Sequence, residues 1–396
     1  MREVLSWKAF YPEWWSEGIR LARLEETHVI CRTLKPGVTI QESIFNTATV
    51  QPVRILFLNQ YFPPDPAPTG ILFGELAERL RAAGHETEFV SANESYRTTQ
   101  RKGGRMRREA TALLKILWSG FSARRPDVVI SGSSPPCLLV AATLIAMRHR
   151  AASVHWAMDL YPELAVSLGE IPGGLPVRGL SKLMGWCYRQ CRQVVALDAD
   201  MARHLAQFGT RPVVIRPWVF APVLKQLAAL DMAQAPKNDS AWTWIYSGNL
   251  GRAHEWKTLL EAQALVERQS SRIRLRFQGG GPSWPTAQAR AVELGLKNCE
   301  WLPYVEESEL PASLLRCNAC VVTQRPEAQA FLWPSKLGLV LSLPRPVIWV
   351  GPPNGAIAES LRQLPHAGIF APGQAEELAS WVLRQDALHS TIPPEA

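Results

Sequence analysis

Hydrophobic and polar positions follow a repeating strand-then-helix pattern from Val53 almost to the end of the chain. Residues 53–59 are nearly all apolar, as expected of a strand buried on both faces of a parallel sheet. Residues 71–83 then repeat apolar side chains at helical spacing, and Gly84 ends that predicted helix. Repeated units of this kind predict an α/β fold with parallel sheets wrapped by helices.

Two series of such units are present. The first series predicts strands at residues 53–59, 87–91, 127–130, 153–158, 194–197 and 213–216, and helices at 71–83, 136–147, 180–192 and 201–208. The second series predicts strands at residues 242–246, 273–278, 299–302, 319–322 and 347–350, and helices at 256–267, 286–294, 307–315, 335–343 and 375–384.

The two series imply two domains, since 396 residues are too many for one compact domain. We expect Rossmann-like domains at residues 53–221 and 241–396, with a polar linker at 222–240. Two such domains predict a ligand cleft between them, at the carboxyl ends of the strands. Residues 1–52 show no clear strand–helix alternation, and we assign this extension no function.

Charge and cysteine content indicate which partners and which disulfide or metal sites the chain can have. The formal net charge of +8 indicates an anionic partner, which can be nucleic acid, anionic lipid or a phosphorylated substrate. Seven cysteines in a long chain do not suggest a disulfide framework. The Cys317-x-x-Cys320 pair lacks the further ligands of a zinc site, so we interpret both thiols as core residues. Asp198-x-Asp200 looks like a turn at a strand end and not like a metal motif.

Membrane contact is expected only at the surface. No run of apolar residues reaches the ~18 needed to span a bilayer, and the N-terminus lacks a signal pattern, which predicts a cytoplasmic protein. Residues 106–121 nevertheless repeat apolar side chains at helical spacing, with Arg107, Arg108 and Lys115 between them. This stretch fits an anionic lipid surface, or equally a helix packed on the sheet with a solvated face.

Three loops that follow predicted strands carry candidate binding groups. The Pro-rich loop at residues 61–70 ends at Gly70, where backbone can approach a ligand at a helix N-terminus. Residues 247–254 bring glycines and a cation to another helix start, which suits a diphosphate. The candidate groups of this second loop are Gly248, Asn249, Gly251, Arg252 and His254. The third loop permits close approach to a nucleotide through Gly279, Gly280 and Gly281, although a tight turn explains it equally well.

Ser335 and Lys336 open the predicted helix at residues 335–343. Ser335 is expected to cap this helix. A lysine in the first turn opposes the helix dipole, and this mismatch favours an anion-binding role for Lys336.

Asp159 and Glu163 follow a predicted strand of the first domain. A carboxylate at this position can orient or deprotonate an acceptor hydroxyl. Helix capping ahead of Pro162 is the alternative interpretation.

Six segments together resemble glycosyltransferase family 4, the retaining enzymes of GT-B fold, and particularly the bacterial members that build exopolysaccharide, capsule or O-antigen. The resemblance covers about residues 53–384. The segments are QYFPPDPAPTG at 60–70, DLYPE at 159–163, YSGNLGRAHE at 246–255, GGGP at 279–282, WPSK at 333–336 and RPVI at 345–348.

This resemblance implies that the second domain binds a nucleotide sugar and the first binds the acceptor. Arg252 and Lys336 would contact the diphosphate, and the glycine turns would line the nucleotide. The family's E-x7-E motif is absent, because Phe331 and Leu339 occupy its positions. The Pro-Ser-Lys subgroup instead places a Glu nearby, which leaves Glu327 and Gln329 as candidates to meet the donor sugar. Many members also carry Arg and Lys where Asn249 and His254 stand.

The sequence therefore predicts a retaining, metal-independent glycosyltransferase without a cofactor. Its catalytic candidates are Asp159, Arg252 and Lys336, and preorganised cations would stabilise the leaving diphosphate. The expected acceptor is a saccharide, with a polyprenyl-diphosphate-linked saccharide as one form, and we expect no nucleic acid partner. A sugar-nucleotide epimerase of the same fold and a non-catalytic binding protein stay as alternatives.

Overall fold

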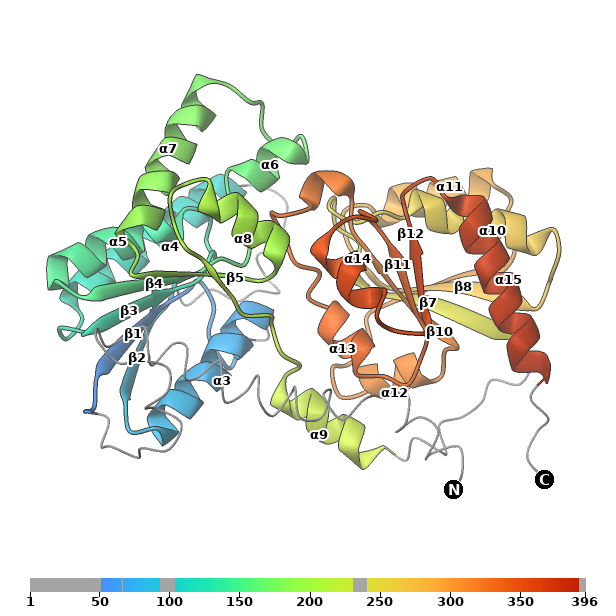
Figure 1. Cartoon of the computed structure of the whole chain (residues 1–396), viewed down its shortest axis with the longest axis horizontal. Coiled ribbons are helices and arrows are strands. Elements are labelled where there is room, and N and C mark those ends of the chain that lie inside the picture. Colours follow the sequence, from blue (N-terminus) through green and yellow to red (C-terminus); the bar gives the residue numbers. More distant parts are fainter. Residues whose placement is uncertain (1–50, 66, 93–103, 231–240, 392–396) are drawn as a thin grey trace. The chain divides into compact units, whose positions relative to one another are not determined.

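The computed structural model describes residues 51–65, 67–92, 104–230 and 241–391. The chain divides into two compact units (Figure 1). The first unit extends to Phe220 and also takes in Ala330–Trp333, and the second comprises Ala221–Gln329 and the residues from Pro334 onward. Most of the N-terminal extension, residues 1–50, lies outside the described residues.

The first unit is built on a parallel six-stranded sheet with the strand order β2-β1-β3-β4-β5-β6. Its strands are β1 (Arg54–Leu58), β2 (Glu86–Val90), β3 (Val128–Ser131), β4 (Ala152–Trp156), β5 (Gln193–Ala196) and β6 (Val213–Val214). Its helices are α3 (Pro68–Ala82), α4 (Arg105–Ser122), α5 (Leu138–His149), α6 (Glu163–Ser167), α7 (Leu175–Gln190) and α8 (Ala199–Ala206).

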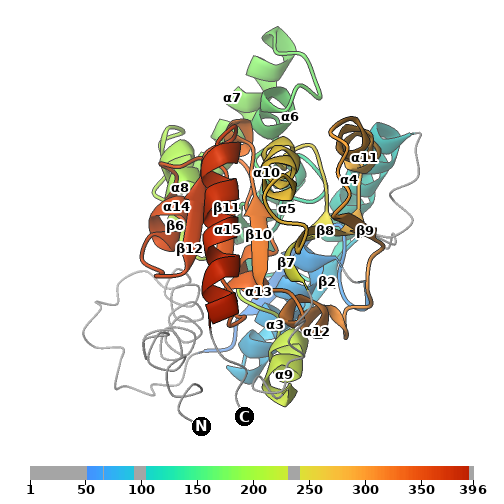
Figure 2. The same ribbon diagram turned by 90° about the vertical axis from the view of Figure 1, so that its right-hand side faces the viewer.

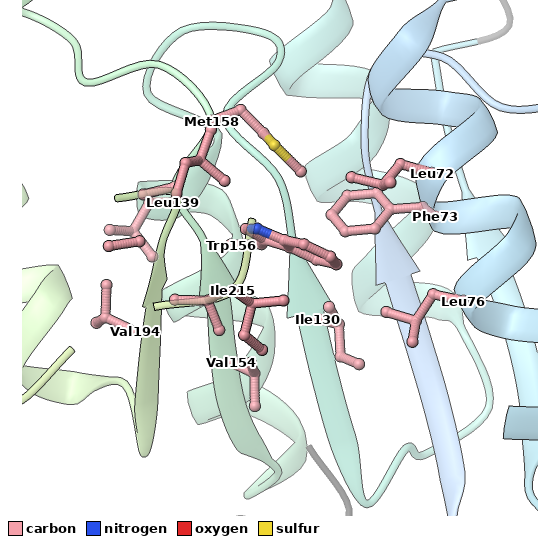
Figure 3. Packing of buried hydrophobic residues seen from close by; sticks show 14 of the residues in the cluster. Leu72, Phe73, Leu76, Ile130, Leu139, Val154, Trp156, Met158, Val194 and Ile215 are labelled. Carbon is pink, nitrogen blue, oxygen red and sulfur yellow. The ribbon is translucent and has the colours of Figure 1, made fainter. Parts of the chain in front are cut away.

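Alternation along β1 divides the core of this unit between the two faces of the sheet. Ile55 and Phe57 belong to a cluster that includes α3, whereas Leu56 and Leu58 belong to a cluster with α4 and α5. Every second side chain of a strand points to the same face, so this central strand must be apolar throughout. Figure 3 shows Trp156 of β4 close to Phe73 of α3, with the two ring centroids 5.8 Å apart.

The second unit repeats the architecture, with the strand order β12-β11-β10-β7-β8-β9. Its strands are β7 (Trp242–Asn249), β8 (Ile273–Gly280), β9 (Cys299–Leu302), β10 (Ala319–Thr323), β11 (Val347–Val350) and β12 (Ala367–Phe370). Its helices are α9 (Ala221–Ala229), α10 (Lys257–Glu267), α11 (Trp284–Glu293), α12 (Leu310–Leu315), α13 (Leu337–Leu341), α14 (Ala356–Leu361) and α15 (Ala375–Thr391). Figure 2 shows α15 beside α10, and the two helices pack together.

The predicted fold of two parallel α/β sheets is confirmed, and two local predictions differ from the structure. Residues 222–229 of the predicted linker belong to α9, a segment rich in Ala and Leu that packs on α12. Residues 231–240 lie outside the described part. The helix expected at 335–343 begins at Leu337, so Ser335 makes no capping bond and Lys336 is the N-cap residue. The short elements α6, α14 and β12 had no sequence prediction.

Two interpretations made from the sequence are confirmed by the packing. Cys317 and Cys320 are buried free thiols. The Asp198 carboxylate accepts a hydrogen bond of 2.7 Å from the Met201 N–H and so caps α8. Among the described residues, no group of three or more His, Cys, Asp or Glu side chains is arranged to hold a metal ion.

Candidate functional site

In the second unit, several predicted site residues lie together at the carboxyl ends of β7 and β8. Gly248 of β7 pairs with Gly279 of β8 in the parallel register. Their φ angles are +126° and +140°, in the region that favours glycine. A Cβ atom at Gly279 would lie 2.2 Å from the Gly248 carbonyl oxygen. The two loops therefore approach each other as closely as glycine backbones allow.

The neighbouring glycines differ in how strictly the backbone requires them. Gly281 has a φ of +128°, and a Cβ there would lie 2.4 Å from the Asn249 Oδ1 atom. A Cβ at Gly280 would lie 3.1 Å from the Tyr304 ring. Gly251 meets only ordinary contacts. The tight-turn interpretation of the triple glycine is supported, and the approach to a nucleotide stays a prediction.

Replacing Gly279 by alanine tests this close approach. We expect Gly279→Ala to lower the free energy of unfolding by about 3 kcal/mol or more, because strain and a backbone clash coincide. Gly295→Ala is the matched control: its φ is +69° but no atom lies within 4 Å of the added Cβ, so about 1 kcal/mol is expected. Urea denaturation measures both values, and equal losses would show that the β7–β8 approach is not tight.

Lys336 lies against these glycine turns. Its Nζ atom is 3.3 Å from the position of a Cβ at Gly248 and 3.6 Å from the centre of the Tyr246 ring. The residue is half-buried overall, yet Nζ is inaccessible and has no hydrogen-bond partner among the described residues. Burial lowers the pKa of Lys336 well below that of an ordinary lysine. A buried amine without a hydrogen-bond acceptor is a strong candidate for an anion ligand.

His254 is held next to this amine as a neutral ring. Its Nδ1 atom lies 3.0 Å from the Thr323 carbonyl oxygen, which requires that Nδ1 carry the proton. Burial, with the nearby Lys336 charge, lowers the pKa of His254 to about 3. The imidazole therefore contributes no positive charge to a diphosphate site, and its Nε2 atom is left as an acceptor.

Arg252 occupies the same loop but points into a different environment. Its side chain is exposed, and its carbonyl accepts a 3.4 Å hydrogen bond from Arg325. Arg325 also pairs with Glu327 at 3.0 Å, and this hydrogen bond lowers the pKa of Glu327. Glu327 is therefore occupied by a cation, whereas Gln329 is half-buried next to Ala330, whose φ is +67°. Which of Glu327 and Gln329 meets the donor sugar stays a prediction.

Three residues of this group had no sequence prediction. Tyr246 supports the Lys336 amine through its ring and donates its hydroxyl to the Asn249 carbonyl at 2.9 Å. Tyr304 is 55% exposed beside Gly280. Arg325 ties the loop after β10 to the loop after β7, because its N–H donates to the Ala253 carbonyl at 2.8 Å. An aromatic residue at the end of a buried strand was the available signal for Tyr246.

The group in the first unit centres on Asp159, directly after β4. A small recess beside Asp159 has a mixed lining, with Ser133, His155, Tyr161 and Tyr188 next to the apolar or thiol side chains of Cys137, Leu138, Leu139 and Met184. The carboxyl group is half-buried, and this burial raises the pKa of Asp159 to about 6. A carboxylate with such a pKa can accept a proton near neutral pH.

Glu163 and Gly70 have local structural roles. The Ser181 hydroxyl donates to Glu163 at 2.5 Å, within the first turn of α6. The alternative interpretation, helix capping, is wrong for both carboxylates, because Pro162 is the N-cap residue of α6 and no side chain makes a capping hydrogen bond there. A Cβ at Gly70 would lie 2.8 Å from the Tyr61 carbonyl oxygen, so the first turn of α3 requires glycine for packing.

Phe331 explains the absence of the E-x7-E motif in physical terms. Its ring packs edge-on against His204 with centroids 4.9 Å apart, and its carbonyl accepts a 2.9 Å hydrogen bond from the Leu160 N–H. Leu332 forms an isolated β-bridge with Asp159. The position that carries the first Glu in other family members is here an apolar packing position in the first unit.

Comparisons with known proteins identify two sequence domains. Residues 70–219 match the profile described as Glycosyltransferase Family 4, and residues 229–331 match Glycosyl transferases group 1. The chain is also 24% identical over 240 residues to "Probable glycosyltransferase WbjE" of Pseudomonas aeruginosa. That match spans 58% of each protein's length.

Solved structures with the same fold include three sugar-related proteins. Sucrose-phosphate synthase from Thermosynechococcus elongatus has a TM-score of 0.58 at 13% identity, covering 85% of this chain and 90% of that one. The lipopolysaccharide outer core galactosyltransferase WaaB has a TM-score of 0.55 at 14% identity, and the match covers 85% of this chain and 91% of WaaB. Anabaena HepE, solved in complex with UDP, has a TM-score of 0.54 at 14% identity, and the match covers 86% of this chain and 91% of HepE. This likeness supports the two-domain α/β fold.

Proposed function

We propose that this chain, a GT-B protein that combines a glycosyltransferase family 4 domain with a glycosyl transferases group 1 domain, transfers a sugar from a nucleotide sugar to a saccharide acceptor. One observation carries the proposal. The Lys336 amine is buried without a hydrogen-bond acceptor, against a glycine turn at the carboxyl ends of two parallel strands. A diphosphate supplies the missing acceptors.

The departing nucleotide requires stabilisation of negative charge. Cleavage of a glycosyl–phosphate bond leaves that charge on the diphosphate, and a preorganised cation in a water-poor site stabilises it most effectively. In this proposal Lys336 binds the diphosphate from within and the exposed Arg252 from the solvent side. Gln329 contacts the donor sugar, and the neutral His254 accepts from a sugar hydroxyl.

Nucleotide binding tests the proposal directly. UDP is the first candidate, since HepE has been solved with UDP and UDP-glucose. We expect UDP to raise the melting temperature more than GDP, ADP or dTDP. A free UDP concentration of about 100 times its Kd would stabilise the folded protein by ~2.7 kcal/mol.

Arg252→Ala is expected to weaken UDP binding about tenfold, as for a solvent-side hydrogen bond to a charged group. Arg268→Ala changes an exposed arginine of the same unit and should leave the affinity unchanged. If no nucleotide stabilises the protein, the proposal fails.

We further propose that transfer proceeds with retention of anomeric configuration, on a hexosyl donor and without a metal ion or cofactor. The support is the resemblance to family 4 and a site whose charge is supplied by side-chain cations. NMR of the product reports the anomer. Activity that disappears with EDTA and returns with a divalent metal would overturn the metal-independent part.

The acceptor proposed is a saccharide of cell-surface polysaccharide biosynthesis, in a form linked to polyprenyl diphosphate. The name of WaaB, a lipopolysaccharide outer core galactosyltransferase, supports a cell-surface saccharide, and the resemblance to the bacterial members of family 4 supports its lipid-linked form. Among the described residues, no helix is both long and apolar enough to cross a bilayer. We therefore propose that the protein meets such an acceptor from the cytoplasmic side, at the surface of the membrane.

Two rival activities make different predictions in one assay. With donor alone, an epimerase converts the sugar nucleotide, whereas a transferase leaves it intact until acceptor is added. A non-catalytic protein binds the donor but shows no turnover, whichever acceptor is added. The outcome expected here is turnover that depends on acceptor.

A further inference from the structure

Three helices of the first unit share one side of its sheet. The central helix, α5, packs against both α4 and α7 (Figure 1). The α4–α5 contact is close, because a Cβ at Gly120 would lie 2.4 Å from the Ile145 side chain. The solvent-facing residues of α4, α5 and α7 therefore form one surface, which we name the outer helical face.

This outer helical face exposes large apolar side chains. Of the fourteen large hydrophobic residues exposed in the described chain, eight belong to these three helices. They are Leu114, Trp118, Phe121, Leu144, Met147, Leu175, Leu183 and Trp186. Trp118 is 78% exposed and Leu114 67% exposed. In contrast, Leu113 and Leu117 of α4 pack toward the core, so the helix is apolar on two sides.

The charges on the same helices have nearly one sign. The sequences of α4, α5 and α7 contain eight Lys and Arg residues and a single acid, Glu109. The exposed cations include Arg107, Lys115, Arg148, Arg178 and Lys182. This ratio is far from that of the whole chain, which has 43 basic and 35 acidic residues.

We propose that the outer helical face docks on an anionic lipid bilayer. Exposed tryptophan and leucine beside lysine and arginine suit the boundary between headgroups and acyl chains, where apolar side chains insert and cations meet phosphate. Tryptophan is particularly suited to such an interface. The near absence of acidic residues on the three helices matches the uniform negative charge of an anionic bilayer surface, whereas a protein partner would have to supply an acidic group opposite each cation.

The inference deepens the proposed function and rests on it in one respect only, the lipid-linked form of the acceptor. The Asp159 recess borders this face, because residues of α5 and α7 are among its lining. Binding of the nucleotide sugar involves the second unit, so lipid docking and donor binding can be measured separately.

Vesicle flotation of the full-length chain tests the proposal. We expect the protein to float with vesicles of equal parts phosphatidylcholine and phosphatidylglycerol, but not with phosphatidylcholine alone, and to be released by high salt. Leu114→Gln combined with Trp118→Gln should lower the vesicle affinity about tenfold. Val292→Gln is the matched control, because Val292 is 80% exposed on α11 of the second unit.

A charge variant provides an independent readout. Lys115→Glu combined with Lys182→Glu should reduce binding to anionic vesicles more than tenfold, whereas Lys297→Glu in the second unit should not change it. Each variant should keep the wild-type UDP-induced thermal shift. Binding that is equal in wild type and both double variants would overturn the proposal. A concentration-dependent dimer that the Leu114 and Trp118 changes abolish, without vesicle binding, would assign the face to a second copy of the chain instead.

Discussion

Replacing Lys336 by methionine is expected to lower kcat/KM for sugar transfer about a thousandfold while the protein stays folded. The loss corresponds to about 4 kcal/mol, in the range found when one preorganised donor to a developing charge is removed. Methionine has similar length and can occupy the same space against Tyr246 and Gly248. Steady-state kinetics with saturating acceptor measure the effect.

The same substitution should stabilise the free protein near neutral pH. The pKa of Lys336 is lowered on folding, so between its folded pKa and that of an ordinary lysine the unfolded chain binds more protons. Stability of the wild type therefore rises with pH across this window. The gain in melting temperature from Lys336→Met should accordingly be largest at the low-pH end of this window. It should shrink as the pH approaches about 10.5.

A matched control separates charge in general from charge at this position. Lys257→Met removes an exposed lysine from the start of α10 in the same unit and should leave kcat/KM unchanged. If Lys336→Met retained more than about a tenth of the activity, Lys336 would not be the internal diphosphate ligand. A melting temperature that fell with Lys336→Met would contradict the argument from burial.

The fold could be predicted from sequence because its strands are buried on both faces. Residues 53–59 and 347–350 have no polar alternation, and this uniformity identified β1 and β11 at once. Helix ends were harder to locate. α9 lies in a segment interpreted as a linker from its polar residues, although its own sequence is rich in Ala, Leu, Lys and Gln, which are strong helix formers.

The candidate site was predictable where a residue contradicted its local setting. Lys336 opposes a helix dipole, and the structure places its amine, buried, against a glycine turn. Its neighbours depend on tertiary contacts. Burial and the Lys336 charge keep His254 neutral, and the Thr323 carbonyl, 69 residues away in sequence, fixes Nδ1 as the protonated nitrogen. The pairing of Glu327 with Arg325 likewise could not be read from spacing alone.

The second large effect expected concerns Asp159. Asp159→Asn should lower kcat about a hundredfold, because it removes a carboxylate able to accept the acceptor hydroxyl proton, a contribution of roughly 10²–10⁴ in rate. The wild-type rate should rise with pH through about 6, the pKa to which burial raises this carboxyl group. The variant should lose that rise.

The stability of Asp159→Asn gives a test that does not depend on turnover. The raised pKa means that between about pH 4 and 6 the folded protein holds a proton that the unfolded chain has released, so wild-type stability falls as pH rises through this window. The variant lacks this titration, and its melting temperature relative to wild type should increase from pH 4 to pH 7. Glu163→Gln is the control in the same motif: its carboxylate accepts from Ser181, and no change in the pH dependence of the rate is expected. A pH profile that Asp159→Asn left unaltered would assign proton transfer to a group other than Asp159, and the leaving diphosphate itself would then be the base.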